Sequence, residues 1–142
     1  LEGKSVTIRG DGAVLPSETV SSGAITLDSA AGEVVVGLPY TMTVKTLPTE
    51  FDVGLGSMQG QRVRWSRPLI RVYKSTRPTV NSEFIPNRTG ADKMDKKVPR
   101  FCGFLEYGSL TWDNTSGVTI TDSNPLPVEI SNITGTVDTG IK

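Results

Sequence analysis

The sequence contains no histidine and only one cysteine, Cys102. Without histidine, the chain lacks the commonest metal ligand and the usual general base of enzymes. A single cysteine also excludes a disulfide within the chain, and Ser-His or Cys-His nucleophilic systems cannot form. We therefore expect no cofactor, no metal site and no catalytic residues. Cys102 lies in the apolar segment 100–105, which predicts a buried structural thiol.

Long hydrophobic runs are missing as well. The longest apolar stretches span only a few residues, such as Val34-Val35-Val36, whereas a membrane helix needs about 20. We therefore expect no membrane span. Fifteen basic and fifteen acidic side chains cancel, which argues against a dedicated nucleic-acid-binding domain. Because the chain starts at Leu1 and has no strong stop signal, we expect it to be a fragment of a larger protein.

What the sequence has is a β pattern. Fifteen glycines and nine prolines divide it into short segments, which are rich in the β-branched residues that suit strands. No segment keeps a helical period for three turns. Strand-like segments recur about every ten residues, which favours an all-β fold, either an antiparallel sandwich or a barrel. The candidate strands are 5–9, 13–15, 24–28, 33–38, 40–47, 62–74, 100–107, 109–112, 118–121 and 128–130.

The 142 residues predict a single β domain, 1–142. Within it, the apolar run 33–38 is expected to be a strand buried on both faces. Tyr40, Met42 and Val44 alternate along the next segment, so we expect them to share a core-facing side. The polar stretch 75–99 predicts one long loop over the surface.

Carboxylates are the remaining candidates for catalysis. Glu50 and Asp52 are close in sequence, and Glu18 and Asp28 more loosely so. A glycosidase needs two carboxylates facing each other across a cleft, but isolated surface acids are far commoner. We expect no paired-acid chemistry. The glycine-rich stretch 52–61 lacks the Gly-Lys-Ser/Thr ending of a phosphate loop, so nucleotide binding is not predicted.

Basic residues gather along the candidate strand 62–74. The four that we select as a possible inter-subunit or partner contact are Arg62, Arg64, Arg67 and Arg71. One interpretation is a basic stripe that touches phosphate or an acidic partner. The other is a solvated strand face whose arginines pair with acids on the neighbouring strand. We favour the second, and we do not expect a DNA-reading stripe.

The segment around Gly37-Leu38-Pro39-Tyr40 resembles a segment of the tubular or nozzle-type tail protein of short-tailed (podovirus-like) phages and related prophages. The resemblance covers nearly the whole chain, although Trp65-Ser66-Arg67-Pro68 and the polar middle loop depart from it. The other similar segments are Leu1-Glu2-Gly3-Lys4-Ser5-Val6-Thr7-Ile8, Asp11-Gly12-Ala13-Val14, Gly23-Ala24-Ile25-Thr26-Leu27-Asp28, Thr46-Leu47-Pro48, Gln59-Gly60, Arg71-Val72-Tyr73-Lys74-Ser75 and Pro125-Leu126-Pro127-Val128.

This resemblance implies a structural virion protein, present in the bacterial cytoplasm before assembly. Copies would repeat around the tail axis as a ring, in contact with other tail-protein subunits and with neighbouring domains of the same parent chain. They would help to form the conduit for DNA ejection without binding the passing DNA tightly. The family implies no catalytic residues. From the residues themselves we expect the isolated chain to be a monomer. Strand alternation directs most apolar side chains into the core, which leaves few for the large apolar surface of an obligate interface.

Two other classes of function stay open. A carbohydrate- or receptor-binding β-sandwich would need exposed aromatic residues, for which Trp65, Tyr107 and Trp112 are candidates, although core positions suit them better. A small hydrolase would need a pair of carboxylates.

Overall fold

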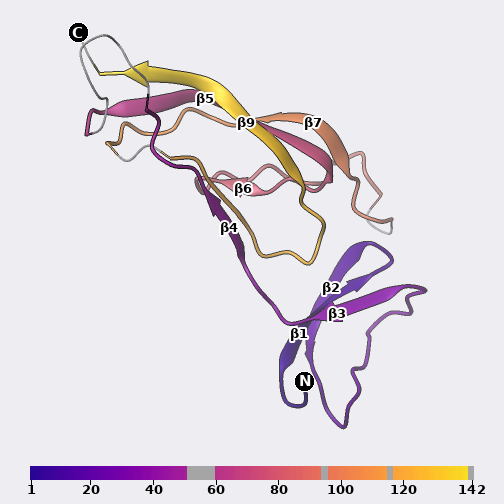
Figure 1. The fold of residues 1–142 in the computed structure, drawn as a ribbon. Helices are drawn as coiled ribbons and strands as arrows, with labels where there is room; N and C mark the ends of the chain where they lie inside the picture. Colours follow the sequence, from indigo (N-terminus) through magenta and orange to yellow (C-terminus); the bar gives the residue numbers. More distant parts are fainter. Residues whose placement is uncertain (51–59, 94–95, 115–116, 141–142) are drawn as a thin grey trace.

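The computed structural model describes residues 1–50, 60–93, 96–114 and 117–140 (Figure 1). Within these ranges the chain forms nine strands and no helix, so the all-β prediction is confirmed. The strands form three antiparallel sheets of three strands each, and none of the sheets closes into a barrel. No helix in the described part could cross a membrane. Residues 52–59 of the glycine-rich stretch lie outside the described residues.

The first sheet has the order β2-β1-β3, with strands β1 (Ser5–Gly10), β2 (Ala13–Thr19) and β3 (Val34–Gly37). Alternation along β1 buries Val6 and Ile8 completely, as its period-2 pattern predicts. The turn from β1 to β2 passes through Asp11 and Gly12, which both have positive φ. The Asp11 carboxylate also accepts the backbone N–H groups of Gly32 and Glu33, at 3.0 and 2.9 Å. These bonds fix the chain at the start of β3 and lower the pKa of Asp11.

The prediction that 33–38 is buried on both faces is wrong. Val35 is 47% exposed, and Val34 and Val36 are 39% exposed. The reason lies in the order of the strands: β3 is at the edge of a three-stranded sheet, and it pairs only with β1. An apolar run without alternation is typical of a doubly covered strand, but the sequence does not indicate whether covering elements exist.

The other two sheets face each other across the larger core. Their orders are β4-β8-β6 and β7-β5-β9. The six strands are β4 (Met42–Lys45), β5 (Val63–Ser75), β6 (Thr79–Val80), β7 (Phe101–Glu106), β8 (Thr119–Asp122) and β9 (Ile130–Thr139). The buried members of this core are Ile70, Val72, Val80, Leu105, Tyr107, Val118 and Ile120. Because the core takes residues from both sheets, this part of the chain is sandwich-like.

Strand β4 departs from the prediction for Tyr40, Met42 and Val44. Only Met42 packs against the larger core, and it is only partly buried. Tyr40 is 78% exposed and precedes the strand, and Val44 is also exposed. β4 is an edge strand of four residues, so the sheet opposite it covers only one of the three positions.

The predicted surface loop 75–99 begins with buried residues. Ser75, Thr76 and Val80 are almost fully inaccessible, and β6 pairs with β8. The Ser75 hydroxyl accepts the backbone N–H of Glu129 at 2.6 Å, and the Thr76 hydroxyl donates to the carbonyl of Pro127 at 3.3 Å. The two hydroxyls thus form hydrogen bonds with backbone groups of Pro127 and Glu129, so Ser75 and Thr76 can be buried although they are polar.

The thiol prediction is also wrong, because Cys102 is exposed. Along β7, Leu105 points into the core, whereas Cys102 and Phe104 point outward. The Cys102 sulfur lies 3.2 Å from the backbone nitrogen of Lys74, whose N–H it accepts. Apolar neighbours in sequence therefore did not place Cys102 in the core, because alternation puts it on the opposite face.

Most of the buried apolar residues form two clusters. The smaller one, Val6, Ile8 and Val20, belongs to the first sheet and is flanked by Leu15, Ile25 and Leu27. In Figure 1 the first sheet lies to one side, and the chain runs from β3 into β4 and the other two sheets.

Candidate subunit-contact surface on β5

The outer face of the β7-β5-β9 sheet carries the arginines that the sequence singled out. β5 pairs with both neighbours, and its register with β9 shifts between Trp65 and Arg67. This bulge places Arg64 and Arg67 on the same face, although their spacing of three would put them on opposite faces of a regular strand. Pro68, next to the bulge, is buried in the central strand of the sheet, where its missing N–H would otherwise break the ladder.

Gly135 of β9 is part of this bulge. A Cβ atom at this position would overlap the carbonyl oxygen of Arg67 and touch the Trp65 ring. Only glycine allows β9 to approach β5 this closely.

Arg64 is fixed by an acid and by an aromatic ring. Its guanidinium donates to Asp138 of β9 at 2.8 and 3.3 Å. The same group lies 5.0 Å from the centre of the Trp112 ring, within the range of a cation–π interaction. Both side chains of the ion pair are about one third exposed, at 36% and 37%. Arg64 is therefore held in one orientation at the margin of the sheet.

Arg67 forms a two-bond ion pair with Glu106 of β7, at 2.6 and 2.9 Å. The hydrogen bonds from Arg67 lower the pKa of Glu106, and the bonds to Glu106 raise the pKa of Arg67. Such a planar, two-bond contact gives the arginine a defined direction even though both side chains are exposed.

Arg71 is placed differently. Its guanidinium lies 5.6 Å from the centre of the Phe104 ring on β7, and Phe104 is itself exposed. No carboxylate of the described residues forms an ion pair with Arg71. Tyr73, further along β5, is also exposed and lies under the ammonium group of Lys74 at 5.1 Å. This end of the surface is therefore cationic and aromatic.

The structure brings three of the four predicted residues together. Arg64, Arg67 and Arg71 share the outer face of β5, and Arg62 precedes the strand, where its carbonyl accepts the N–H of Gly140 at 3.0 Å. Acids on neighbouring strands pair with Arg64 and Arg67, as the second interpretation of the sequence predicts. The sequence did not identify which acids take part, because they are 39 and 74 positions away. The "β5 surface" below means Arg64, Arg67, Arg71, Phe104 and Glu106.

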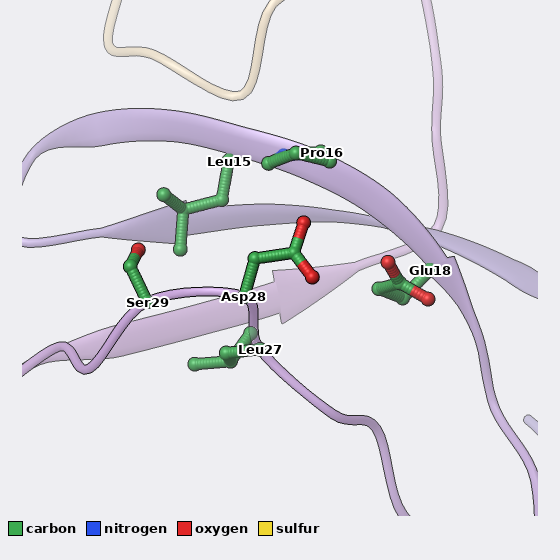
Figure 2. Close-up of a pocket in the computed structure, with 6 residues that line it drawn as sticks. All are labelled: Leu15, Pro16, Glu18, Leu27, Asp28 and Ser29. Carbon is green, nitrogen blue, oxygen red and sulfur yellow. The ribbon is translucent and has the colours of Figure 1, made fainter.

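Of the carboxylates considered for catalysis, Glu18 and Asp28 line one small hollow beside β2 (Figure 2). Figure 2 shows the Asp28 carboxylate directed toward β2, between Leu15 and Glu18. The hollow has a volume of about 10 Å³, which is room for one water molecule and not for a sugar ring. Asp52, the partner considered for Glu50, lies outside the described residues. Among the described side chains, no cluster could hold a metal ion.

The three candidate aromatics do not form a platform for a glycan. Tyr107 is buried, and its hydroxyl donates to the carbonyl of Pro78 at 2.7 Å. Trp65 packs partly against the core, and its indole nitrogen is buried without a hydrogen-bond partner among the described residues. Only Trp112 is substantially exposed, and Arg64 lies over its ring.

No protein-family model matches this chain, and no curated protein sequence matches it.

Proposed function

We propose that this chain is a structural, non-enzymatic domain of a phage tail, in a tubular or nozzle-type tail protein that helps to form the conduit for DNA ejection. The ordered series of segments that resemble this family supports the proposal. The all-β fold also supports it, because paired strands suit the wall of a tube. The proposal places the protein in the virion, and in the bacterial cytoplasm before assembly.

The β5 surface is the observation that carries the proposal. Arginine and aromatic residues are the types enriched where proteins meet. Here Arg64 and Arg67 are already oriented by Asp138 and Glu106, so a neighbouring subunit that binds them loses little side-chain entropy. Arg71 and Phe104 stay exposed beside them and offer a cation and a ring to a partner.

The same surface explains why passing DNA would not be held tightly. Two of its arginines are neutralised by carboxylates, and the whole chain has a formal net charge of zero. Non-specific DNA affinity grows with the number of phosphates that basic side chains neutralise. We propose that Arg62, Arg64, Arg67 and Arg71 face other tail-protein subunits or neighbouring domains in a ring-shaped parent, and that the isolated chain is a monomer at moderate concentration.

Immunoelectron microscopy tests the location of the protein. Antibodies raised against the purified chain are applied to tailed particles from a culture that carries the gene. We expect them to decorate the tail, and mass spectrometry of the same particles to detect peptides of the chain. Particles that lack the chain, or decoration of the capsid alone, would overturn the proposal.

A pair of matched variants tests the surface. The double substitution Arg67→Ala/Arg71→Ala should lower incorporation into particles by about tenfold or more, as expected when interface arginines are removed. Lys4→Ala removes an exposed cation outside the β5 surface and should leave incorporation unchanged. Circular dichroism of both purified variants checks that they fold. Equal incorporation of the two folded variants would refute the role of the β5 surface.

A further inference from the structure

One edge of the first sheet is open. In the pairing of β3 with β1, Val35 lies opposite Arg9 and Gly37 opposite Thr7. The backbone N–H of Asp11 donates to the carbonyl of Glu33 at 2.9 Å, so Asp11 and Glu33 form a hydrogen-bonded pair. Hydrogen-bonded and non-hydrogen-bonded pairs alternate along an antiparallel ladder, so the pairs Arg9–Val35 and Thr7–Gly37 are also hydrogen-bonded. The backbone groups of Val35 and Gly37 are thus directed to β1, and those of Val34 and Val36 are directed away from the sheet. No strand of the described residues pairs with this side of β3.

This open edge is short, but it lacks two other features that usually prevent strands from adding to a sheet. Edge strands are commonly protected by proline or charged side chains. The opposite edge of the same sheet, β2, contains Pro16 and Glu18. β3 contains neither, and Leu38 continues its exposed apolar surface. The two edges of one sheet therefore differ: β2 carries both protective residue types, and β3 carries neither.

We propose that β3 pairs antiparallel with β3 of a second copy of this chain, so that two three-stranded sheets join into one of six strands about a two-fold axis. Antiparallel pairing directs the outward groups of one strand to those of the other. With Val36 opposite Val36 of the second copy, Val34 lies opposite Leu38, and every position from Val34 to Leu38 has an apolar partner.

Charge permits a second copy as the occupant, and shape favours it. Glu33 flanks β3, and in this register the two Glu33 residues are six positions apart along the strand direction, roughly 20 Å at about 3.3 Å per residue. That separation exceeds the screening length of about 8 Å at physiological salt, so the acids do not repel strongly. In the same register Val35 lies opposite Gly37, where a Cβ atom would meet no atom within 4 Å.

The space above Gly37 can take the side chain that the second copy brings. A hollow of about 120 Å³ lies beside it, between β3 and residues 123–125 of the same chain, and Val35, Leu38 and Tyr40 are among its lining residues. In the joined sheet, Val35 of each copy fills the open space over Gly37 of the other. Strand addition of this kind takes its affinity from backbone hydrogen bonds and its specificity from the pockets beside them.

The contact is short, so it is weak in solution. A stable interface usually buries more than about 1,000 Å², which one five-residue edge does not reach. Its two-fold symmetry also differs from the head-to-tail contacts that close a ring. The β3 contact therefore goes beyond the proposed function, and either proposal can fail without the other.

Analytical ultracentrifugation and cross-linking test the β3 contact. The chain should sediment as a monomer at about 10 μM and increasingly as a dimer toward about 1 mM. Val36→Lys places two ammonium groups face to face on the two-fold axis and should weaken the dimer by more than about tenfold. Val14→Lys, at an exposed position on β2, is the matched control and should dimerise like the parent chain. Circular dichroism confirms that both variants fold.

A cysteine at the two-fold position gives a second measurement. In a Cys102→Ser background, Val36→Cys should form a disulfide-linked dimer under mild oxidation about tenfold faster than Val14→Cys, because paired strands bring its two copies within disulfide range. A chain that stays monomeric to about 1 mM, with equal cross-linking of the two cysteine variants, would overturn the proposal. So would a dimer that persists unchanged in Val36→Lys.

Discussion

The first sheet and the two facing sheets are built from similar strand sequences but are buried to different degrees. Around β1, three residues form the buried cluster, whereas seven form the core between the β5 and β8 sheets. The difference does not come from strand propensity, since valine and isoleucine dominate in both. It comes from layering: two facing sheets cover each other's inner side, and a lone three-stranded sheet has mostly loop residues to cover one face.

The largest expected effect tests the larger core. Ile70 is fully buried there, so Ile70→Ala should lower the free energy of unfolding by about 2–5 kcal/mol. Urea unfolding followed by tryptophan fluorescence measures this part of the chain alone, because Trp65 and Trp112 are the only two tryptophans.

Ile8→Ala makes the same chemical change in the first sheet, where Ile8 is also fully buried. We expect it to reduce the β signal in circular dichroism while shifting the fluorescence transition by less than about 0.5 kcal/mol, the usual effect of a change remote from a core. An equal shift of the fluorescence transition in both variants would mean that the two regions unfold as one unit.

A smaller effect is expected at Tyr107, which is buried. Tyr107→Phe leaves the carbonyl of Pro78 without its buried donor and should cost about 1–3 kcal/mol. Burial raises the pKa of Tyr107 from 10.0 to about 12. Because the folded-state value lies above the unfolded one, this contribution is complete below pH 10 and is lost as the pH rises toward about 12.

Urea unfolding at a series of pH values from neutral to strongly alkaline measures this loss. Tyr107→Phe should flatten the alkaline decline, whereas Tyr40→Phe, at a largely exposed ring, should leave it unchanged. An identical decline in both variants would show that another group controls it.

Ion pairs give a weaker comparison between the two regions. The Arg64–Asp138 pair is 2.8 Å long with both side chains about one third exposed, and the Arg9–Glu33 pair is 3.5 Å long with Glu33 largely exposed. Double-mutant cycles with alanine should give a coupling of about 0.5–1 kcal/mol for the first pair and near zero for the second. The reverse order would contradict the geometric argument.

The smallest effect belongs to Cys102. Since its thiol is exposed, Cys102→Ser should change the free energy of unfolding by less than about 0.5 kcal/mol. A thiol reagent such as Ellman's should label Cys102 fully in the folded protein. Labelling only after denaturant is added would show that the sulfur is covered.

Alternation in the sequence predicted the all-β fold and several of its strands, but not the bulge that puts Arg64 and Arg67 on the same face. It could not predict which strands lie at edges, and this accounts for the errors at Val34, Val35 and Val36 as well as at Val44. It also could not predict the partners of Arg64 and Arg67, because those contacts join strands 39 or more positions apart. A local pattern determines the face of a strand, and only tertiary pairing determines what covers that face.

The pairing of β5 with β9 has a consequence for synthesis of the chain on the ribosome. All three strands of the first sheet lie within residues 5–37, whereas β5 needs partners as far along as Thr139. At about 5–20 residues per second, the 102 residues from 37 to 139 take roughly 5–20 s to add. During that interval all three strands of the first sheet have been synthesised, whereas β9, which pairs with β5, has not. The first sheet can therefore form before the sheet around β5, which stays incomplete until Thr139 has been added.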